Sequence, residues 1–147
     1  MIKPEDLRIG DLVRASHDCA FPKGTRCVVT DINPLTVFED KKGTACLSAI
    51  NDDDDGPWWI WCCKIGGIPV TSEFLEKNGF KEEQHQKEGT SEWYDYYHYG
   101  LGINIVYEVD GNKFAAYLDG KKLREIQYAH ELQHILWALG LNAELKV

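Results

Sequence analysis

The residues with the clearest chemical potential lie near the end of the chain, where His130, Glu131 and His134 form an HExxH motif. On a helix, histidines four residues apart project from the same side, so both imidazoles can bind one zinc ion. The glutamate between them can then act as general base toward a zinc-bound water. These three residues define one candidate site, with zinc as its cofactor and peptide hydrolysis as its reaction.

A catalytic zinc site needs a third protein ligand, and the sequence supplies none at a typical spacing. In the metzincin pattern a third histidine follows the second by six residues, where this chain has Gly140. Glu144 is the only acidic residue after the motif, and His98 is the one reasonable candidate before it. We therefore prefer a structural helix and keep the zinc peptidase as the alternative.

The segment that carries this motif also has the apolar periodicity of a packing helix, over residues 128–139. Gly140 follows, as a residue that ends a helix in a left-handed conformation. His130, His134 and Trp137 lie opposite the apolar stripe, and we expect them to be exposed and available to a protein partner. At about 100° per residue, the stripe itself consists of Tyr128, Leu132, Ile135, Leu136 and Leu139.

We expect this helix to cover an antiparallel sheet formed by the segment before it. Asp110-Gly111 and Asp119-Gly120 are typical of tight hairpin turns, so consecutive strands should pair as a meander. The charged stretch at residues 81–91 lacks alternation and is predicted to be an exposed loop. Alternating residues predict four strands, at residues 93–99, 103–109, 113–118 and 121–126.

Two further features belong to this C-terminal module. Thr71 and Gly79 are placed to cap a short helix at its two ends. Residues 93–99 are dense in aromatic side chains. These side chains fit ordinary cross-strand pairs and, as an alternative, stacking on a sugar, a base or a peptide.

The N-terminal part of the chain predicts a module of short strands, which begin near Asp11 and continue at residues 26–32, 36–38, 44–49 and 58–61. Five short strands within about sixty residues favour a small SH3-like β-barrel over a sandwich. The predicted linker is Gly66-Gly67-Ile68-Pro69. It separates an SH3-like module over residues 1–66 from an α+β module over residues 67–147.

Two stretches of the N-terminal module could bind a ligand. Trp59 and Trp61 share one face of their strand, and aromatic residues at the rim of a small barrel can form a peptide groove. Residues 51–57 match the start of an EF-hand calcium loop, but Cys62 stands where the bidentate glutamate is required. We therefore predict a solvated acidic turn without calcium.

The charge balance makes nucleic acid a weak candidate partner. The 147 residues carry a net charge of −8, with 8 basic against 11 acidic residues in 1–70 and 8 against 13 in 71–147. Proteins that bind phosphate backbones normally show a basic surface. No apolar run approaches the length of a membrane span, and the five cysteines contain no C-x-x-C pair. We expect a cytoplasmic protein with reduced thiols.

Three stretches together resemble an uncharacterised family of small proteins from gut bacteria, their prophages and mobile elements. They are Leu7-Arg-Ile-Gly10, the stretch Gly-Ile-Pro-Val-Thr-Ser-Glu-Phe-Leu-Glu-Lys-Asn-Gly-Phe at residues 67–80, and the His-x-Leu-Gln-x-Ile core of the terminal helix. Members of that family often carry amide residues where this chain has Glu131 and His134. The resemblance therefore implies a structural helix and no assigned activity.

Together these patterns favour an α+β protein that acts as a non-catalytic accessory or protein-interaction module of a bacterial or phage-derived system. The alternative is a small zinc-dependent metallopeptidase that uses His130, Glu131 and His134. The third hypothesis is a nucleic-acid-binding protein that acts through the small barrel. The candidate partner residues are His130, His134, Trp137, Trp59 and Trp61.

Overall fold

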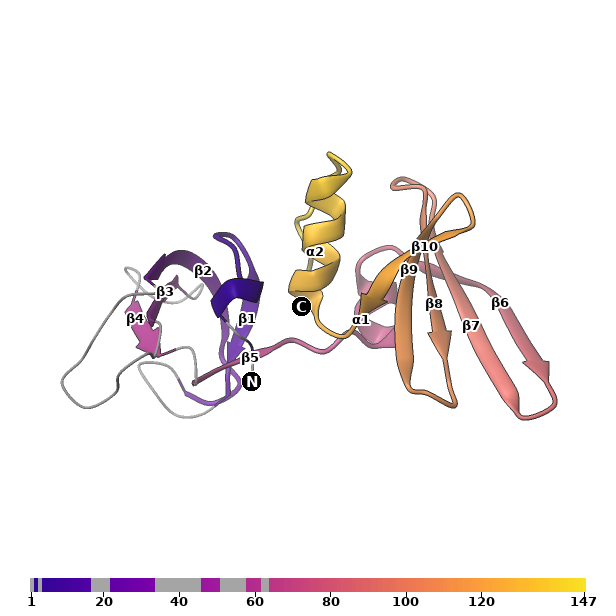
Figure 1. The fold of residues 1–147 in the computed structure, drawn as a ribbon, viewed down its shortest axis with the longest axis horizontal. Helices are drawn as coiled ribbons and strands as arrows, with labels where there is room; N and C mark the ends of the chain where they lie inside the picture. Colours follow the sequence, from indigo (N-terminus) through magenta and orange to yellow (C-terminus); the bar gives the residue numbers. More distant parts are fainter. Residues whose placement is uncertain (1, 3, 17–21, 34–45, 51–57, 62–63) are drawn as a thin grey trace. The chain divides into compact units, whose positions relative to one another are not determined.

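The computed structural model of the chain describes residues 2, 4–16, 22–33, 46–50, 58–61 and 64–147. The chain divides into two compact units, Met1–Ile68 and Pro69–Val147. The boundary expected after residue 66 lies close to this division. Each unit has an antiparallel sheet, and the helices α1 and α2 both belong to the second unit, so the chain is α+β (Figure 1).

The first unit contains an antiparallel sheet with the strand order β4-β3-β2-β1-β5. A short 3-10 helix, η1 (Pro4–Asp6), precedes the sheet. In this order β4 and β5 form the two edges, so the described sheet is open and not closed into a barrel. The strands are β1 (Leu12–Ala15), β2 (Arg26–Asn33), β3 (Cys46–Ile50), β4 (Trp58–Trp61) and β5 (Ile65–Gly67).

The strand β5 corrects one prediction, because Gly66 and Gly67 were expected to start a linker. Both residues pair with β1, Gly66 with Arg14 and Gly67 with Val13. A Cβ atom on Gly66 would lie 3.3 Å from the Cβ of Ser16, so the glycine lets the two strands approach closely. The strand predicted at 36–38 and the acidic turn at 51–57 lie outside the described residues.

The core of the first unit is one apolar cluster from the residues on either side of η1 and from the strands β1, β2, β4 and β5; a turn precedes β1. That turn holds the buried Asp11, whose Oδ2 accepts a hydrogen bond from the backbone N–H of Arg8 at 2.7 Å. The buried members of the cluster are Ile2, Leu7, Val13, Ala15, Cys27, Val29, Ile60 and Ile65.

The second unit is a five-stranded antiparallel meander, in the order β10-β9-β8-β7-β6, with two helices. The four predicted strands are confirmed as β7 to β10. The elements are α1 (Ser72–Lys77), β6 (Lys81–Glu88), β7 (Ser91–His98), β8 (Ile103–Glu108), β9 (Lys113–Leu118), β10 (Lys121–Ile126) and α2 (Ala129–Ala138).

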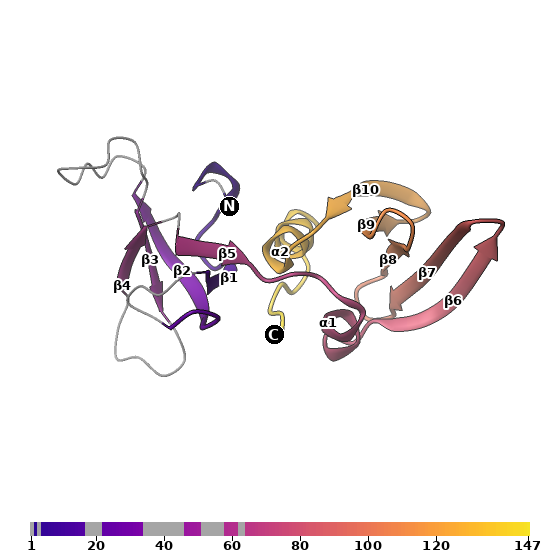
Figure 2. The same cartoon turned by 90° about the horizontal axis from the view of Figure 1, so that it is seen from below.

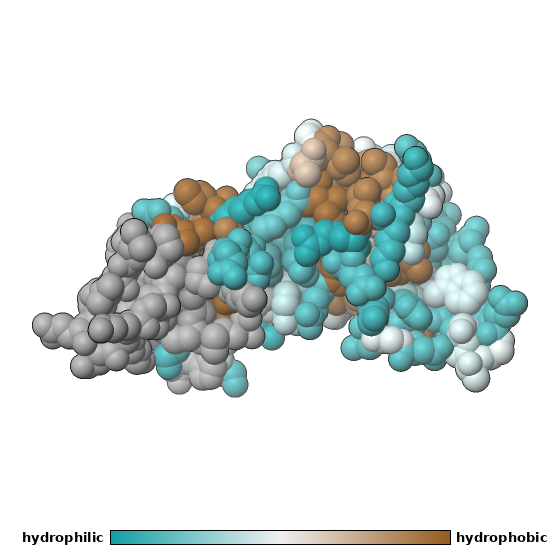
Figure 3. All heavy atoms as spheres, in the orientation of Figure 1, coloured by the Kyte–Doolittle hydropathy of each residue, from teal (hydrophilic) through white to brown (hydrophobic). Residues whose placement is uncertain are grey.

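The prediction of a loop at 81–91 is wrong, because most of this stretch forms the edge strand β6. Every residue of β6 is exposed, so neither face of the strand required an apolar period. Charged side chains are also common on edge strands, where they hinder pairing with other molecules. Figure 3 shows mainly hydrophilic residues over the β6–β7 hairpin.

The two Asp-Gly sequences form turns of different kinds. Asp119 and Gly120 have φ angles of 49° and 75° and connect the paired residues Leu118 and Lys121, which confirms a tight hairpin. At the other turn the last pair is Glu108 with Lys113, and the positive φ lies at Asn112. A longer loop over residues 109–112 therefore replaces the predicted tight turn.

The caps predicted for the first helix of this unit are confirmed. Thr71 is the N-cap of α1, and its Oγ1 accepts a hydrogen bond from the N–H of Phe74 at 3.1 Å. The N–H of Phe80 donates to the carbonyl of Leu75 at 3.0 Å, as expected when Gly79 follows the helix end. The C-terminal tail lies against this end, where Asn78 exchanges two hydrogen bonds with the Lys146 backbone, at 2.7 and 2.6 Å.

Both helices contact the same face of the second sheet (Figure 2). Tyr96 donates a hydrogen bond to Ser72 of α1 at 2.8 Å, and Arg124 pairs with Glu131 of α2 at 3.1 Å. Tyr96 and Arg124 belong to one cross-strand row, through Ile105 and Ala116, so they share a face. We call this the helix-covered face and the opposite one the open face.

In the part of the chain that the structure describes, no helix combines the length and apolar character needed to cross a membrane.

Candidate functional site

The terminal helix α2 forms as predicted, over Ala129–Ala138. It ends with a hydrogen bond from the N–H of Leu141 to the carbonyl of Leu136 at 2.8 Å, so Gly140 has its predicted place after the helix. Leu132, Ile135 and Leu136 of the predicted stripe are buried. Tyr128 is half-buried, and Leu139 is exposed over 37% of its surface.

Glu131, the candidate general base, stabilises the start of this helix. Its Oε2 accepts hydrogen bonds from the backbone N–H groups of Gln127 at 2.6 Å and Tyr128 at 2.9 Å. Its Oε1 accepts a hydrogen bond from the Arg124 guanidinium at 3.1 Å. This is the position at which a glutamate closes a capping box. The carboxylate is thus fully engaged in backbone capping and an ion pair.

The two histidines of the motif belong to a ladder of rings along α2. The ring of His130 lies 5.7 Å from those of Tyr128 and His134, and His134 stacks on Trp137 at 5.7 Å. Only 2% of His130 is exposed, so the expectation of an exposed position is wrong for this residue. Burial extends around α2 beyond the apolar stripe and includes Ala129, His130 and Gln133.

The described residues assemble no ligand set for zinc around this motif. None of them forms a group of three or more His, Cys, Asp or Glu side chains that could hold one metal ion. His98, the candidate third ligand, lies edge-on against Phe80 at 5.1 Å, and its Nδ1 accepts a hydrogen bond from the N–H of Leu101 at 3.1 Å. His98 thus serves the turn after β7, and the zinc site stays a prediction.

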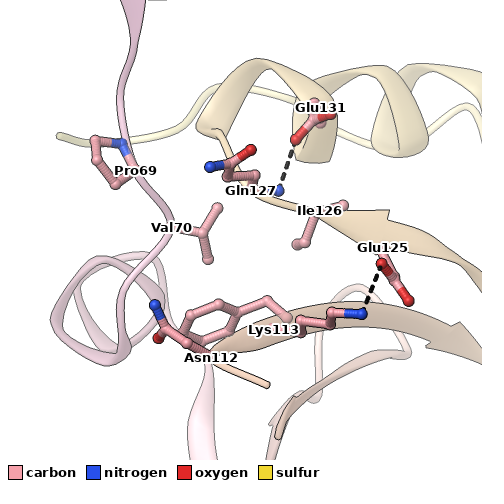
Figure 4. Close-up of a pocket in the computed structure, with 9 residues that line it drawn as sticks. Pro69, Val70, Asn112, Lys113, Glu125, Ile126, Gln127 and Glu131 are labelled. Atoms are coloured by element: carbon pink, nitrogen blue, oxygen red, sulfur yellow. Dashed lines mark hydrogen bonds and ion pairs between the residues drawn. The ribbon is translucent and has the colours of Figure 1, made fainter. Parts of the chain in front are cut away.

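A pocket of about 450 Å³ lies beside the start of α2, between this helix, β9, β10 and the segment that leads into α1 (Figure 4). Its apolar wall includes Val70, Phe114 and Ile126, and its polar wall includes Glu125 and Glu131. Both carboxylates are paired with cations. The hydrogen bond from Lys122 holds the pKa of Glu125 below its ordinary value and raises the pKa of Lys122. The pocket therefore presents compensated charges, and no motif in the sequence predicts it.

The aromatic stretch at 93–99 is divided between the two faces of the sheet by the alternation of β7. On the helix-covered face, four rings directly opposite one another stack across four strands. Their separations are 4.2 Å from His85 to Tyr94, 6.3 Å from Tyr94 to Tyr107 and 4.5 Å from Tyr107 to Phe114. This row confirms the interpretation as cross-strand pairs for the residues on this face.

Hydrogen bonds fix the outer end of this row. The Glu92 carboxylate accepts hydrogen bonds from His85 at 2.7 Å and Tyr94 at 3.2 Å. The bond from His85 is the main reason that the pKa of Glu92 lies below its ordinary value. Partial burial and the neighbouring Glu92 charge raise the pKa of Tyr94. The β6–β7 hairpin is thus held by side chains of one face.

On the open face the aromatic residues remain partly accessible. Trp93, Tyr97 and Tyr117 are half-buried, and Tyr99, in the turn after β7, is 67% exposed. Tyr97 and Tyr117 lie in one cross-strand row, on either side of Asn104. Among the described residues, the side-chain bonds that join α1 and α2 to the sheet lie on the helix-covered face.

A groove of about 400 Å³ lies on the open face near the β9–β10 turn. The rings of Tyr97 and Tyr99 meet there edge to face, 4.9 Å apart and at 83° to each other. Tyr99 donates a hydrogen bond to Glu83 at 2.7 Å, and this bond is the main reason that the pKa of Tyr99 is raised. Asn104 donates a hydrogen bond to Asp95 at 3.1 Å.

The bulge in β6 contributes to this groove. The pairing of β6 with β7 shifts between Glu82 and Gln84, so Glu83 is the extra residue of the strand. Such a bulge changes the direction of a side chain at a sheet edge. Sequence reasoning missed the groove because it treated β6 as a loop, although the exposed aromatic stretch was recognised.

The remaining candidates, Trp59 and Trp61, lie in β4, where Trp59 pairs with Ser48 and Trp61 with Cys46. Their side chains lie outside the described part of the structure, so their role as partner contacts stays a prediction.

Fold and site together define a two-unit α+β protein with an uncovered, aromatic sheet face. Comparisons of the chain with protein-family models, curated proteins and solved structures found no match.

Proposed function

We propose that this protein is a non-catalytic interaction module that binds another protein through the open face of its second sheet. The observation that carries the proposal is the set of partly accessible aromatic residues there: Trp93, Tyr97, Tyr99 and Tyr117. Tyrosine and tryptophan are enriched in protein interfaces, because each offers a large apolar surface with a polar group at its edge. A partner would remove this surface from water.

The chemistry of the HExxH helix supports a non-catalytic role. Glu131 is engaged by two backbone N–H groups and Arg124, so its carboxylate serves the fold of the helix. The His130 ring is enclosed between Tyr128 and His134 in the ladder of rings. The residues of the peptidase alternative therefore all have structural contacts in this unit.

Two finer expectations complete the proposal. The order β4-β3-β2-β1-β5, with the first strand between the second and the fifth, supports an SH3-like barrel for the first unit. We place the protein in the cytoplasm, as an accessory component of a bacterial or phage-derived system. An experimental structure of residues 1–68 that showed β4 and β5 on unrelated, widely separated sheets would contradict the barrel.

The interaction module is tested by affinity capture with the wild-type chain and a Trp93→Ser, Tyr117→Ser double variant. We expect one protein to be retained by the wild type and to be at least about tenfold depleted with the variant, because the interface loses two aromatic contacts. Binding is then measured between the two purified proteins. Leu123→Ser, which removes an exposed apolar side chain from β10, should leave binding unchanged.

A photo-crosslinking amino acid at position 93 gives a second measurement. This measurement does not depend on whether the serine variants fold as well as the wild type. It should attach to the same partner that the double variant loses. Equal retention of the partner by all variants would place binding elsewhere. Capture of nucleic acid alone, or turnover of a peptide substrate, would contradict the proposal itself.

A further inference from the structure

We infer that the groove on the open face binds an arginine side chain from a basic segment of the partner protein. This inference rests on the proposed interaction module and names the chemistry of what it binds. The groove combines two tyrosine rings that meet at a right angle with carboxylates from three separate elements: Glu83 of β6, Asp95 of β7 and Asp119 of the β9–β10 turn.

The first argument is that the charge in this groove is uncompensated. No ion pair among the described residues includes Glu83, Asp95 or Asp119. Glu83 and Asp95 accept hydrogen bonds from the neutral side chains of Tyr99 and Asn104. Glu92 and Glu125 of the same sheet differ in this respect, since each has a cationic partner. No basic residue lines the groove within the described chain. A cation in the groove would meet three carboxylates and no lining cation, while Lys81 lies opposite Tyr97 on the neighbouring strand.

The second argument is the geometry of the rings. Tyr99 is 67% exposed, so one face of its ring is available for stacking, while its hydroxyl is tied to Glu83. A cation over a tyrosine face is attracted by the ring electrons, and a carboxylate beside the ring adds a direct ion pair. The ring of Tyr97 lies at 83° to that of Tyr99 and forms the second wall of this corner.

Arginine fits this corner better than the other candidate groups. Its planar guanidinium can stack on Tyr99 and donate two hydrogen bonds to one carboxylate, whereas the lysine ammonium is a compact, strongly hydrated charge. A neutral sugar could stack on the same ring but would leave three carboxylates without a counter-charge. The net charge of the segment 71–147, with 8 basic and 13 acidic residues, also favours approach of a basic peptide.

The test is a titration of the full chain with a synthetic peptide of alternating arginine and glycine, followed by NMR and calorimetry at low ionic strength. The same peptide is prepared with lysine and with citrulline, which has the shape of arginine without its charge. We expect backbone shifts at residues 97–104 and 119–120. The citrulline peptide should bind at least about tenfold more weakly and the lysine peptide about threefold more weakly.

Variants separate the groove from general attraction to an acidic surface. Tyr99→Ala should weaken binding of the arginine peptide about tenfold, while Tyr99→Phe keeps the ring and most of the affinity. Asp119→Asn should also weaken binding. The matched control is Asp110→Asn, which removes the same charge from the turn at the opposite end of β9 and should change affinity less than twofold.

Three results would overturn the inference: no binding of the arginine peptide, equal affinity for the citrulline peptide, or equal loss in Asp110→Asn and Asp119→Asn. Equal loss in the two Asp→Asn variants would mean that the acidic surface as a whole attracts the peptide, without a specific site in the groove. Binding of the protein partner can depend on Trp93 and Tyr117 and yet be unchanged in Tyr99→Ala. In that case the proposed interaction module is supported and the arginine site is wrong. If the peptide binds this groove but no protein partner depends on Trp93 and Tyr117, the proposed function fails instead.

Discussion

At the scale of single residues, the HExxH motif shows how one pattern can satisfy two requirements. The glutamate that a zinc peptidase would use as a base stands at the third position of α2, where a helix N-terminus also favours an acid. The structure uses it in the second way, with three hydrogen bonds. The spacing in the sequence is the same in both cases, so only the contacts of the carboxylate distinguish them.

We predict that Glu131→Ala lowers the free energy of unfolding of the second unit by about 1–2 kcal/mol, because it removes a helix cap and an ion pair. Chemical denaturation followed by circular dichroism measures this loss. Glu131→Gln, which keeps an acceptor oxygen for the backbone N–H groups, should lose less. An alanine variant as stable as the wild type would contradict the capping role.

At the scale of elements, the predictable parts are those that local chemistry decides. Thr71 caps its helix and Asp119-Gly120 forms its hairpin because these residues suit only a few backbone conformations. The strand β6 could not be predicted, since an edge strand with both faces exposed has no apolar period. His130 could not be placed either, because the apolar stripe of a helix does not reveal how far around the helix burial extends.

The β6–β7 hairpin should respond to pH through Glu92. Its pKa is lower in the folded chain than the ordinary value of about 4.3, chiefly through the hydrogen bond with His85. The stabilisation is therefore complete above the ordinary pKa and is lost as the pH falls through the lower, folded value. We predict lower amide protection factors in β6 in this acidic range, once the observed rates are divided into the intrinsic rates at each pH.

An NMR titration of the Glu92 side-chain carboxyl carbon measures the pKa directly. In a His85→Ala variant the pKa should move up toward the ordinary value, because the main cause of the shift is removed. A wild-type Glu92 that titrates at or above the ordinary value would contradict this account.

At the scale of the whole molecule, charge determines the class of partner more clearly than the fold does. The chain carries a net charge of −8 and has a pI of about 5.0. Such a charge favours solubility at neutral pH and opposes binding to polyanions. In the proposed binding mode, the position of the unpaired carboxylates decides where a basic partner is attracted, which the net charge alone does not show.

We predict that the protein is not retained on heparin at neutral pH and about 0.15 M salt, and that it binds an anion exchanger under low-salt conditions. Both measurements use the intact chain. Retention on heparin that decreases steeply with added salt would contradict this prediction and would support the hypothesis of nucleic-acid binding.

The extra residue in β6 has a consequence for how the protein resists self-association. Deleting Glu83 would restore regular pairing with β7, because Glu82 would stay opposite Tyr96 and Gln84 opposite Asp95. The edge of the sheet would also become flatter, and a flat edge can pair with the same edge of a second molecule. The bulge that brings Glu83 to Tyr99 thus also disfavours edge-to-edge pairing between molecules.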